Sequence, residues 1–348
     1  MRMDENNRNT IILGRDTDLV AYNKINGTIK SIAGDVTEMG YQDGIGSEIR
    51  VNIITGLVIL SGKYIITDRL NDCIRTIDMG SHFSETLAGK CDEPLTESLD
   101  GDFESCVFVS PLAVEAYISD ESYLLFVLQP DAVRKVDLKN GGVTTIPSNF
   151  HGLTAMTQIP NTNNFFITFI DGILLLNGTK YTEIIGNNGT QSLDEYGVTL
   201  TDTHFTQLDA VAYIHPEILL VRERSSDGLK IVDMQAGMVS SICKTNEIIS
   251  GIENCQIEND GAILIDTKER QLLIGQRISG VNIVQTLRYE PSVAKLHMSL
   301  THQSNTRLLN HRVTNVKANT VYRLNCNMMA MTSGTYTLKV SIILHNEG

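Results

Sequence analysis

The stretch Ile74-Arg75-Thr76-Ile77-Asp78 decides the fold, because the same phrase returns at a spacing typical of propeller blades. It returns as Val133-Arg134-Lys135-Val136-Asp137 and as Leu229-Lys230-Ile231-Val232-Asp233. A turn and a β-branched strand follow at 142–146 and at 237–242, and a similar closing strand stands at 27–34. Repeats built of strand after strand indicate propeller blades, because one blade cannot bury both of its faces alone.

The turns divide the chain into six such units. The clearest runs from 91 to 146, the unit at 35–89 matches it, and the others are more degenerate or partial: 10–34, 149–186, 187–243 and 244–287. The partial first unit offers three strands, and we expect 292–298 to supply its missing strand, because a ring must hide its edges. The sequence therefore predicts an all-β, six-bladed β-propeller over residues 1–300. A small C-terminal β extension, a β module or connector, is expected over 301–348.

The order of elements in the two clearest units resembles the NHL repeat. Asp100-Gly101 forms a turn, Cys106 to Pro111 holds a small-x-Phe-x-x-Pro entry, and a hydrophobic strand, the Val133–Asp137 phrase and a closing Val-x-Thr-Ile strand follow. The resemblance covers residues 10–287 and is specific for two units. It implies an extracellular-type NHL propeller. NHL-like propellers include metal-dependent lyases, and related six-bladed hydrolases use calcium in the central tunnel.

Charge argues against two classes of partner. The 348 residues include 28 Lys and Arg against 41 Asp and Glu, a net charge of −13. A surface this acidic repels phosphate backbones and anionic headgroups, so we expect no nucleic acid and no membrane surface as partner. No apolar run reaches the length of a membrane span.

The six cysteines, Cys73, Cys91, Cys106, Cys243, Cys255 and Cys326, form no metal-type pair. Equivalent placement in two units predicts the disulfides Cys91–Cys106 and Cys243–Cys255, each worth ~3 kcal/mol in the chain-entropy model. The alternative is that these cysteines are reduced and buried. Cys73 and Cys326 are left over, to pair with each other or to stay free.

Three Asn-Gly-Thr sequons, at Asn26, Asn177 and Asn188, lie in turn-like sequence. As glycosylation acceptors they agree with the disulfides in predicting a secreted, extracellular glycoprotein. Asn-Gly is also the preferred hairpin turn, which is the alternative explanation.

Candidate catalytic chemistry is sparse. None of the eight histidines sits in a metal-binding motif, and His151 is the channel candidate because it precedes an expected innermost strand. A turn-capping or channel-filling role is the alternative for His151. The expected inner strands at 112–114, 153–155 and 210–212 are small and apolar, and no Gly-x-Ser-x-Gly elbow occurs. We therefore predict no catalytic residues, no metal and no cofactor.

These observations favour a non-enzymatic extracellular binding or structural module. It would use a propeller face and a C-terminal β segment for protein–protein contacts or assembly, because the apolar run at 335–344 would otherwise be an adhesive edge. The expected partner is an extracellular protein, self-assembly included, with a glycan less favoured. The alternative is a metal-dependent propeller enzyme, a lyase or hydrolase, with its site in the central channel.

Overall fold

The computed structural model divides into two compact units, Met1–Leu287 and Arg288–Gly348. The structure describes residues 1–4, 7, 9–93, 96–185, 191–192, 198–200, 203–205, 207–215, 218–224, 228–235, 237–243, 263–266, 271–278, 281–288, 321–329 and 335–343. No helix in these ranges is long and apolar enough to cross a membrane.

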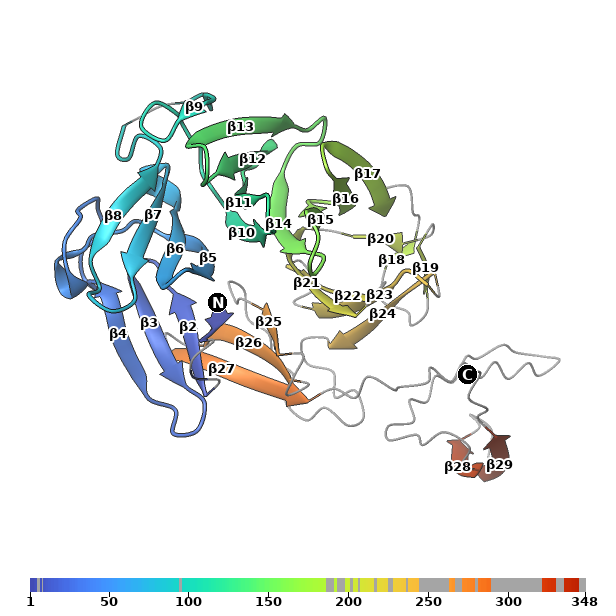
Figure 1. Cartoon of the computed structure of the whole chain (residues 1–348). Helices are drawn as coiled ribbons and strands as arrows, with labels where there is room; N and C mark the ends of the chain where they lie inside the picture. The colour runs from blue at the N-terminus through green and yellow to red at the C-terminus, as the bar shows by residue number, and fades with distance from the viewer. Residues whose placement is uncertain are drawn as a thin grey trace. The chain divides into compact units, whose positions relative to one another are not determined.

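The first unit is a β-propeller with five blades, numbered 1 to 5 along the chain (Figure 1). Each blade is an antiparallel sheet of four consecutive strands. Blade 1 holds β1 (Arg2–Met3), β2 (Thr10–Gly14), β3 (Asp18–Asn23) and β4 (Ile29–Gly34). Blade 2 holds β5 (Ile54–Leu60), β6 (Lys63–Asp68), β7 (Cys73–Asp78) and β8 (Ser84–Ala88).

The other three blades follow the same plan. Blade 3 holds β10 (Ala113–Ile118), β11 (Tyr123–Leu128), β12 (Ala132–Asp137) and β13 (Gly142–Pro147), with β9 (Gly101–Asp102) added to β13. Blade 4 holds β14 (Leu153–Gln158), β15 (Asn164–Phe169), β16 (Gly172–Asn177) and β17 (Lys180–Ile185). Blade 5 holds β21 (Leu208–His215), β22 (Ile218–Glu223), β23 (Gly228–Asp233) and β24 (Met238–Cys243), with β19 (Val198–Thr199) added to β24. The short strands β18 (Gln191–Ser192) and β20 (Thr203–His204) pair in parallel.

The blades pack face to face, and a separate apolar cluster fills each of the four seams between consecutive blades. Successive residues of a strand point to opposite faces, so Ile66 packs toward blade 1 while its neighbour Ile65 packs toward blade 3. The same division separates Phe165 from Phe166 in blade 4. Burial on both faces explains why the central strands read as continuous apolar runs rather than as alternating ones.

The six-blade count is corrected to five. The unit at 244–287 forms the three-stranded sheet β25 (Ile263–Asp266), β26 (Gln271–Ile278) and β27 (Val281–Arg288), rather than a four-stranded blade. A fourth strand would have to come from 244–262, which lie outside the described residues.

The strand that blade 1 was missing comes from the start of the chain. In β1, Arg2 pairs with Ile12 and Met3 pairs with Ile11. Two residues are too short for a periodicity signal, which is why the sequence pointed instead to 292–298. Those residues lie outside the described part of the chain.

The second unit contains an antiparallel hairpin of β28 (Val321–Met329) and β29 (Thr335–Ile343). β29 covers all but the last residue of the apolar run at 335–344. The boundary at 300/301 stays a prediction, since 289–320 lie outside the described residues.

Candidate functional site

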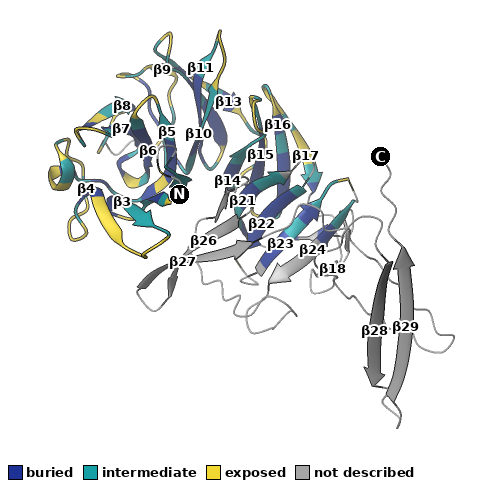
Figure 2. Cartoon of the chain, turned by 60° about the horizontal axis from the view of Figure 1, so that its bottom comes forward, coloured by how far each residue is buried: buried dark blue, intermediate teal, exposed yellow. Residues whose placement is uncertain are grey.

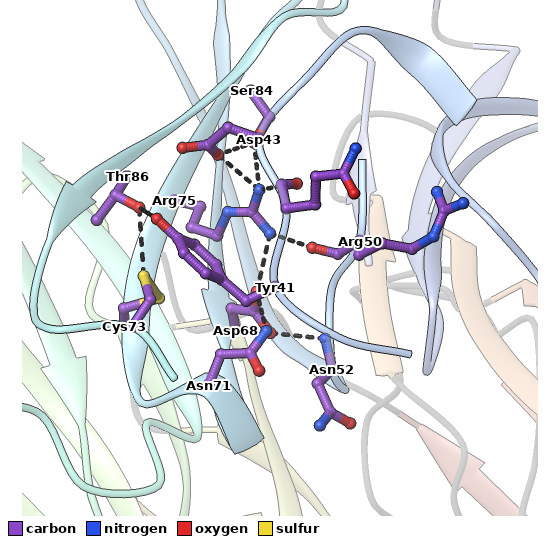
Figure 3. The surroundings of a disulfide bond; sticks show 12 residues. Tyr41, Asp43, Arg50, Asn52, Asp68, Asn71, Cys73, Arg75, Ser84 and Thr86 are labelled. Carbon is purple, nitrogen blue, oxygen red and sulfur yellow. Dashed lines mark hydrogen bonds and ion pairs between the residues drawn. A yellow bond between two sulfur atoms is a disulfide. The ribbon is translucent and has the colours of Figure 1, made fainter. Parts of the chain in front are cut away.

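The arginine of the repeated phrase is a buried clamp (Figure 3). Arg75, on β7, is fully buried, and its Nη2 lies 2.6 Å from Asp43 Oδ1 while its Nη1 lies 3.1 Å from Asp68 Oδ2. It also donates to the carbonyls of Gln42 and Arg50. The clamp thus ties the third strand of blade 2 to the loop that precedes the blade.

Arg134, on β12, makes the equivalent clamp in blade 3. Its guanidinium donates to the carbonyls of Val107 and Leu99 at 2.6 and 2.7 Å, and to Asp100 Oδ1 at 3.2 Å. Thr145 Oγ1 donates to the same Asp100 oxygen at 2.6 Å. Burial acts to raise the pKa of Asp100, but the bonds from Thr145 and the charge of Arg134 hold that pKa below its usual value.

The third copy of the phrase carries Lys230, which is buried and lies 3.3 Å from Glu223 Oε2. Glu223 ends β22 as Asp68 ends β6, so the acid–base spacing is the same in blades 2 and 5. The repeated phrase is therefore a structural element, which the sequence detected as a repeat without revealing what the cation does. The signal available was a basic residue in the middle of an otherwise apolar, buried strand.

The last residue of the phrase caps the next turn. Asp78 Oδ1 accepts from the N–H groups of Gly80 and Ser81, and Asp137 Oδ1 accepts from those of Lys139 and Asn140. These hydrogen bonds hold the pKa of both carboxyls below its ordinary value, with Ser81 the largest cause at Asp78 and Asn140 the largest at Asp137.

The predicted disulfide Cys91–Cys106 is wrong. The structure joins Cys91 to Cys73, with a Cα–Cα distance of 5.2 Å. The reason is the path of the chain after β8, where Asp92 N donates to Asn71 O at 3.0 Å and brings Cys91 back over the start of β7. Cys106 is a free, buried thiol, and burial raises its pKa. Cys243–Cys255 stays a prediction, because Cys255 lies outside the described residues, and so does the state of Cys326.

Polar side chains mark the beginning of several innermost strands. Each begins with a register shift, and there Thr55 bonds Thr67 at 2.9 Å in blade 2, while Thr154 bonds Thr168 at 2.8 Å in blade 4. In blade 5 an ion pair takes this place: Arg222 holds Asp209 with two hydrogen bonds of 2.7 and 2.8 Å. The sequence reading of these strands as uniformly apolar overlooked Asp209, because it lies one residue before 210–212.

The first residues of the chain reach the inner strands of blades 2 and 3. Arg2 Nε donates to Leu57 O at 2.7 Å, and Arg2 Nη2 lies 2.6 Å from Glu115 Oε2 and 3.4 Å from Val114 O. Burial lowers the pKa of the Met1 amino group to about 5. On the innermost strands of the five blades, as far as the structure describes them, the acids Glu115 and Asp209 are each paired with an arginine.

The remaining predicted residues lie apart. His151 is exposed in the loop between β13 and β14, and its role as a channel residue stays a prediction. Asn26 is exposed in the β3–β4 turn, Asn177 is exposed at the end of β16, and Asn188 lies outside the described residues. The described residues contain no group of three or more His, Cys, Asp or Glu that could hold a metal ion.

Large apolar side chains are exposed on the loop that joins blades 1 and 2 and on the turn between β7 and β8. Val36, Met39, Ile45 and Phe83 are 65%, 59%, 55% and 45% exposed, and we call these four residues the outer strip. Ile45 and Phe83 face each other in an antiparallel bridge. Arg50 holds the loop in shape, because its side chain bonds Glu38 at 2.7 Å and the carbonyl of Ser47 at 2.7 Å. Three of the four side chains are thus displayed on a braced loop, and the fourth is bridged to it.

The loop that carries Val36, Met39 and Ile45 also carries four carboxylates. Asp35, Glu38, Asp43 and Glu48 lie in the same loop, against Arg50 and the buried Arg75. The surface therefore combines exposed apolar side chains with a small excess of negative charge. Apolar patches rimmed by polar groups are typical of protein interaction sites.

No family model matches the chain, and no curated protein matches it. Among solved structures it is similar to an auxiliary nutrient binding protein from Bacteroides thetaiotaomicron VPI-5482, with a TM-score of 0.59 and 12% identity over 82% of this chain and 67% of that one. A second auxiliary nutrient binding protein, from Bacteroides ovatus ATCC 8483, gives a TM-score of 0.57 and 11% identity over 83% of this chain and 68% of that one.

A third similar structure is an extracellular domain, described as part of a hybrid two component system of B. thetaiotaomicron. It gives a TM-score of 0.51 and 10% identity over 84% of this chain, which spans 32% of that chain. At these identities the likeness establishes the fold alone. The chain is a β-propeller.

Proposed function

We propose that this chain is a non-enzymatic, extracellular protein-binding module that contacts its partner through the outer strip. The exposure of three large apolar side chains on one braced loop, with Phe83 bridged to that loop at Ile45, carries the proposal. Buried apolar and aromatic anchors supply most of the free energy of binding in protein interfaces, and Met39, Ile45 and Phe83 are side chains of that kind.

The state of the charged groups supports a binding role over a catalytic one. Asp68, Glu115, Asp209 and Glu223 each face an arginine or lysine that joins two strands, within one blade or, for Glu115, between blades. A general base or nucleophile needs a reactive atom accessible to substrate, whereas these carboxylates are held in structural pairs. Metal analysis of the purified protein tests the enzyme alternative, since a stoichiometric ion in the channel would favour it.

The extracellular assignment is also part of the proposal. The disulfide Cys73–Cys91 supports it, because disulfides persist in oxidising compartments. Exposed Asn26 and Asn177 are accessible for glycosylation, and with Asn188 they are the proposed acceptors. The expected result is a fall in intact mass of native protein after glycosidase treatment. An unchanged mass together with a free Cys73 thiol in the native protein would contradict secretion.

A crosslinking experiment tests the binding surface. A photoreactive amino acid at Ile45 should capture a specific partner from native extracellular fluid, and the same residue at Ile118, which is 46% exposed on blade 3, should not. With the captured partner purified, Ile45→Asp should weaken binding at least thirtyfold, as for a hot spot worth about 2 kcal/mol. The matched change Ile118→Asp should leave it within twofold. Equal effects of the two changes would overturn the proposed surface.

A further inference from the structure

Three of the five blades cover their outer strand with an extended segment that precedes the blade. In blade 2, Ser84 N donates to Gly44 O at 2.9 Å and Gly46 N donates to His82 O at 3.1 Å. In blade 3, β9 pairs with β13, and in blade 5, β19 pairs with β24. This fold therefore covers such edges with a short added strand held by main-chain hydrogen bonds.

Polar contacts from the blade hold the added segment in blades 2 and 3. Asp43 accepts from Arg75 and from Ser84 Oγ, and Asp100 accepts from Arg134 and Thr145. The two segments are thus recognised both through their main chain and through one aspartate.

Blade 1 has the same outer strand, and no described segment covers it. Val20 occupies the position of Arg75, since Val20 pairs with Ser31 as Arg75 pairs with Thr86. Among the described residues only β3 pairs with β4, and the side chains of Ile29, Lys30 and Ser31 are exposed, as Figure 2 shows for β4. Because Val20 cannot bind an aspartate, a segment that fits this edge does not need the aspartate that the covering segments of blades 2 and 3 carry.

The open edge is continuous with the outer strip. β4 leads at Gly34 into the loop that carries Val36 and Met39, and it packs beside the 3-10 turn Gly46–Glu48, which follows Ile45. A segment lying along β4 therefore reaches the proposed binding surface. The other uncovered outer strand, β17, carries both Lys180 and Glu183 exposed and runs into no such group of apolar side chains within the described chain.

We propose that β4 accepts an extended segment of a partner protein as an added outer strand. The inference rests on the proposed function and names how the partner binds: main-chain hydrogen bonds to the edge supply the register, and apolar side chains contact the outer strip. The carboxylates around the strip outnumber the neighbouring cations, Lys30 included, so the segment carries basic side chains beside its apolar ones. Open edges of this kind are templates for strand pairing.

Substitutions at Ile29 can distinguish a hydrogen bond from its main-chain N–H from a contact of its side chain. Ile29 is equivalent to Ser84, because Ile29 pairs with Tyr22 as Ser84 pairs with Ile77, and the N–H of Ser84 is the group that binds the cover in blade 2. Ile29→Pro removes this N–H at an edge position where proline is tolerated, whereas Ile29→Ala removes only the side chain. Thermal melting of both variants shows that the propeller stays folded.

The probe is a displayed library of random 12-residue peptides, panned on the purified full chain. Enriched peptides should alternate apolar residues and carry net positive charge, and a synthetic one should bind at least tenfold more weakly to Ile29→Pro than to Ile29→Ala. In an added strand, every second N–H of the peptide faces β4. Methylating the main-chain nitrogens of that alternate set of residues should therefore abolish binding, whereas methylating those of the other set should not.

The outcomes distinguish the two proposals. Peptides lost with Ile45→Asp but indifferent to Ile29→Pro and to methylation would overturn strand addition and leave the outer strip as the binding surface. Acidic enriched peptides would overturn the partner's charge. Enriched peptides that bind the Ile45→Asp and Ile29→Pro variants with the same affinity as the native chain would overturn both proposals.

Discussion

At the scale of residues, the buried cations explain why the repeat exists. Arg75 and Arg134 bind main-chain carbonyls and a carboxylate of the preceding loop and so hold that loop against the third strand of their blade. Each guanidinium also lies 5.1 Å from the centre of an aromatic ring, Arg75 from that of Tyr41 and Arg134 from that of Phe108. A guanidinium offers five donors in a planar fork, which is why arginine suits a site with several acceptors. The phrase is thus repeated for a local geometric reason.

The first prediction concerns this clamp. Arg75→Leu leaves Asp68 buried without its cation and should lower the free energy of unfolding by about 3–5 kcal/mol, the cost of breaking a buried ion pair. Burial already raises the pKa of Asp68. The matched change Lys63→Leu breaks the exposed pair with Glu85 and should cost less than about 1 kcal/mol. Guanidinium denaturation measures both, and equal losses would show that the clamp is not structural.

The second prediction concerns acid. The pKa values of Asp78 and Asp137 are lower in the folded chain than in the unfolded one, because turn amides bind their charged forms. The unfolded chain therefore takes up more protons as the pH falls, and the stability that these carboxylates provide at neutral pH is lost as the pH falls through their folded-state pKa values. The double variant Asp78→Asn, Asp137→Asn should show a shallower fall of melting temperature below about pH 4.

The matched control for this titration is Asp120→Asn, at an exposed bend between β10 and β11. It should reproduce the native curve. If the melting temperature of the double variant falls with acid as steeply as that of the native chain, other carboxyls govern acid unfolding.

At the scale of elements, the close packing at the seams between blades limits the size of the side chains that the inner strands can carry. Gly56, on β5, approaches blade 3 so closely that an added Cβ would lie 2.8 Å from Val114 N and 2.9 Å from Ala113 Cα. Both neighbours are main-chain atoms and cannot move aside singly. Gly56→Ala should therefore destabilise the propeller by about 1–3 kcal/mol, as other overpacked sites do.

Gly142→Ala is the control for this change, because it also lies in a strand and no atom within 4 Å would meet its Cβ. It should be neutral or slightly stabilising in thermal melting. If Gly56→Ala melts with the native chain, the two blades can separate at no cost and the seam is looser than its packing indicates.

Elements show what the sequence could and could not predict. The phrase predicted the third strands well: Ile74–Asp78 lies within β7, Val133–Asp137 within β12 and Leu229–Asp233 within β23. Composition and period thus identify a propeller, because every blade must bury both faces. Disulfide pairing could not be predicted in this way. The partner of Cys91 depends on how the chain turns after β8, and the repeat spacing carries no information about that turn.

The site was harder to predict than the fold. The outer strip consists of single apolar residues in a loop and a turn, and only their exposure distinguishes them from core residues. The uncovered edge of β4 likewise emerges only by comparison of one blade with another, through the replacement of Arg75 by Val20.

At the scale of the whole molecule, the last prediction concerns its division. The contacts separate Met1–Leu287 from Arg288–Gly348, and a two-stranded hairpin such as β28–β29 is marginally stable alone in water. Deleting 288–348 should leave a folded propeller with its melting temperature nearly unchanged, because the four seams lie before residue 288.

Circular dichroism and thermal melting of two truncations check this division. If the chain ending at 300 folds and the chain ending at 287 does not, the propeller needs residues beyond Leu287, as the sequence-based boundary requires. If both fold but lose the self-association or partner binding of the full chain, the C-terminal segment is a connector. If both unfold, the C-terminal strands belong to the propeller itself, and the division into two units is wrong.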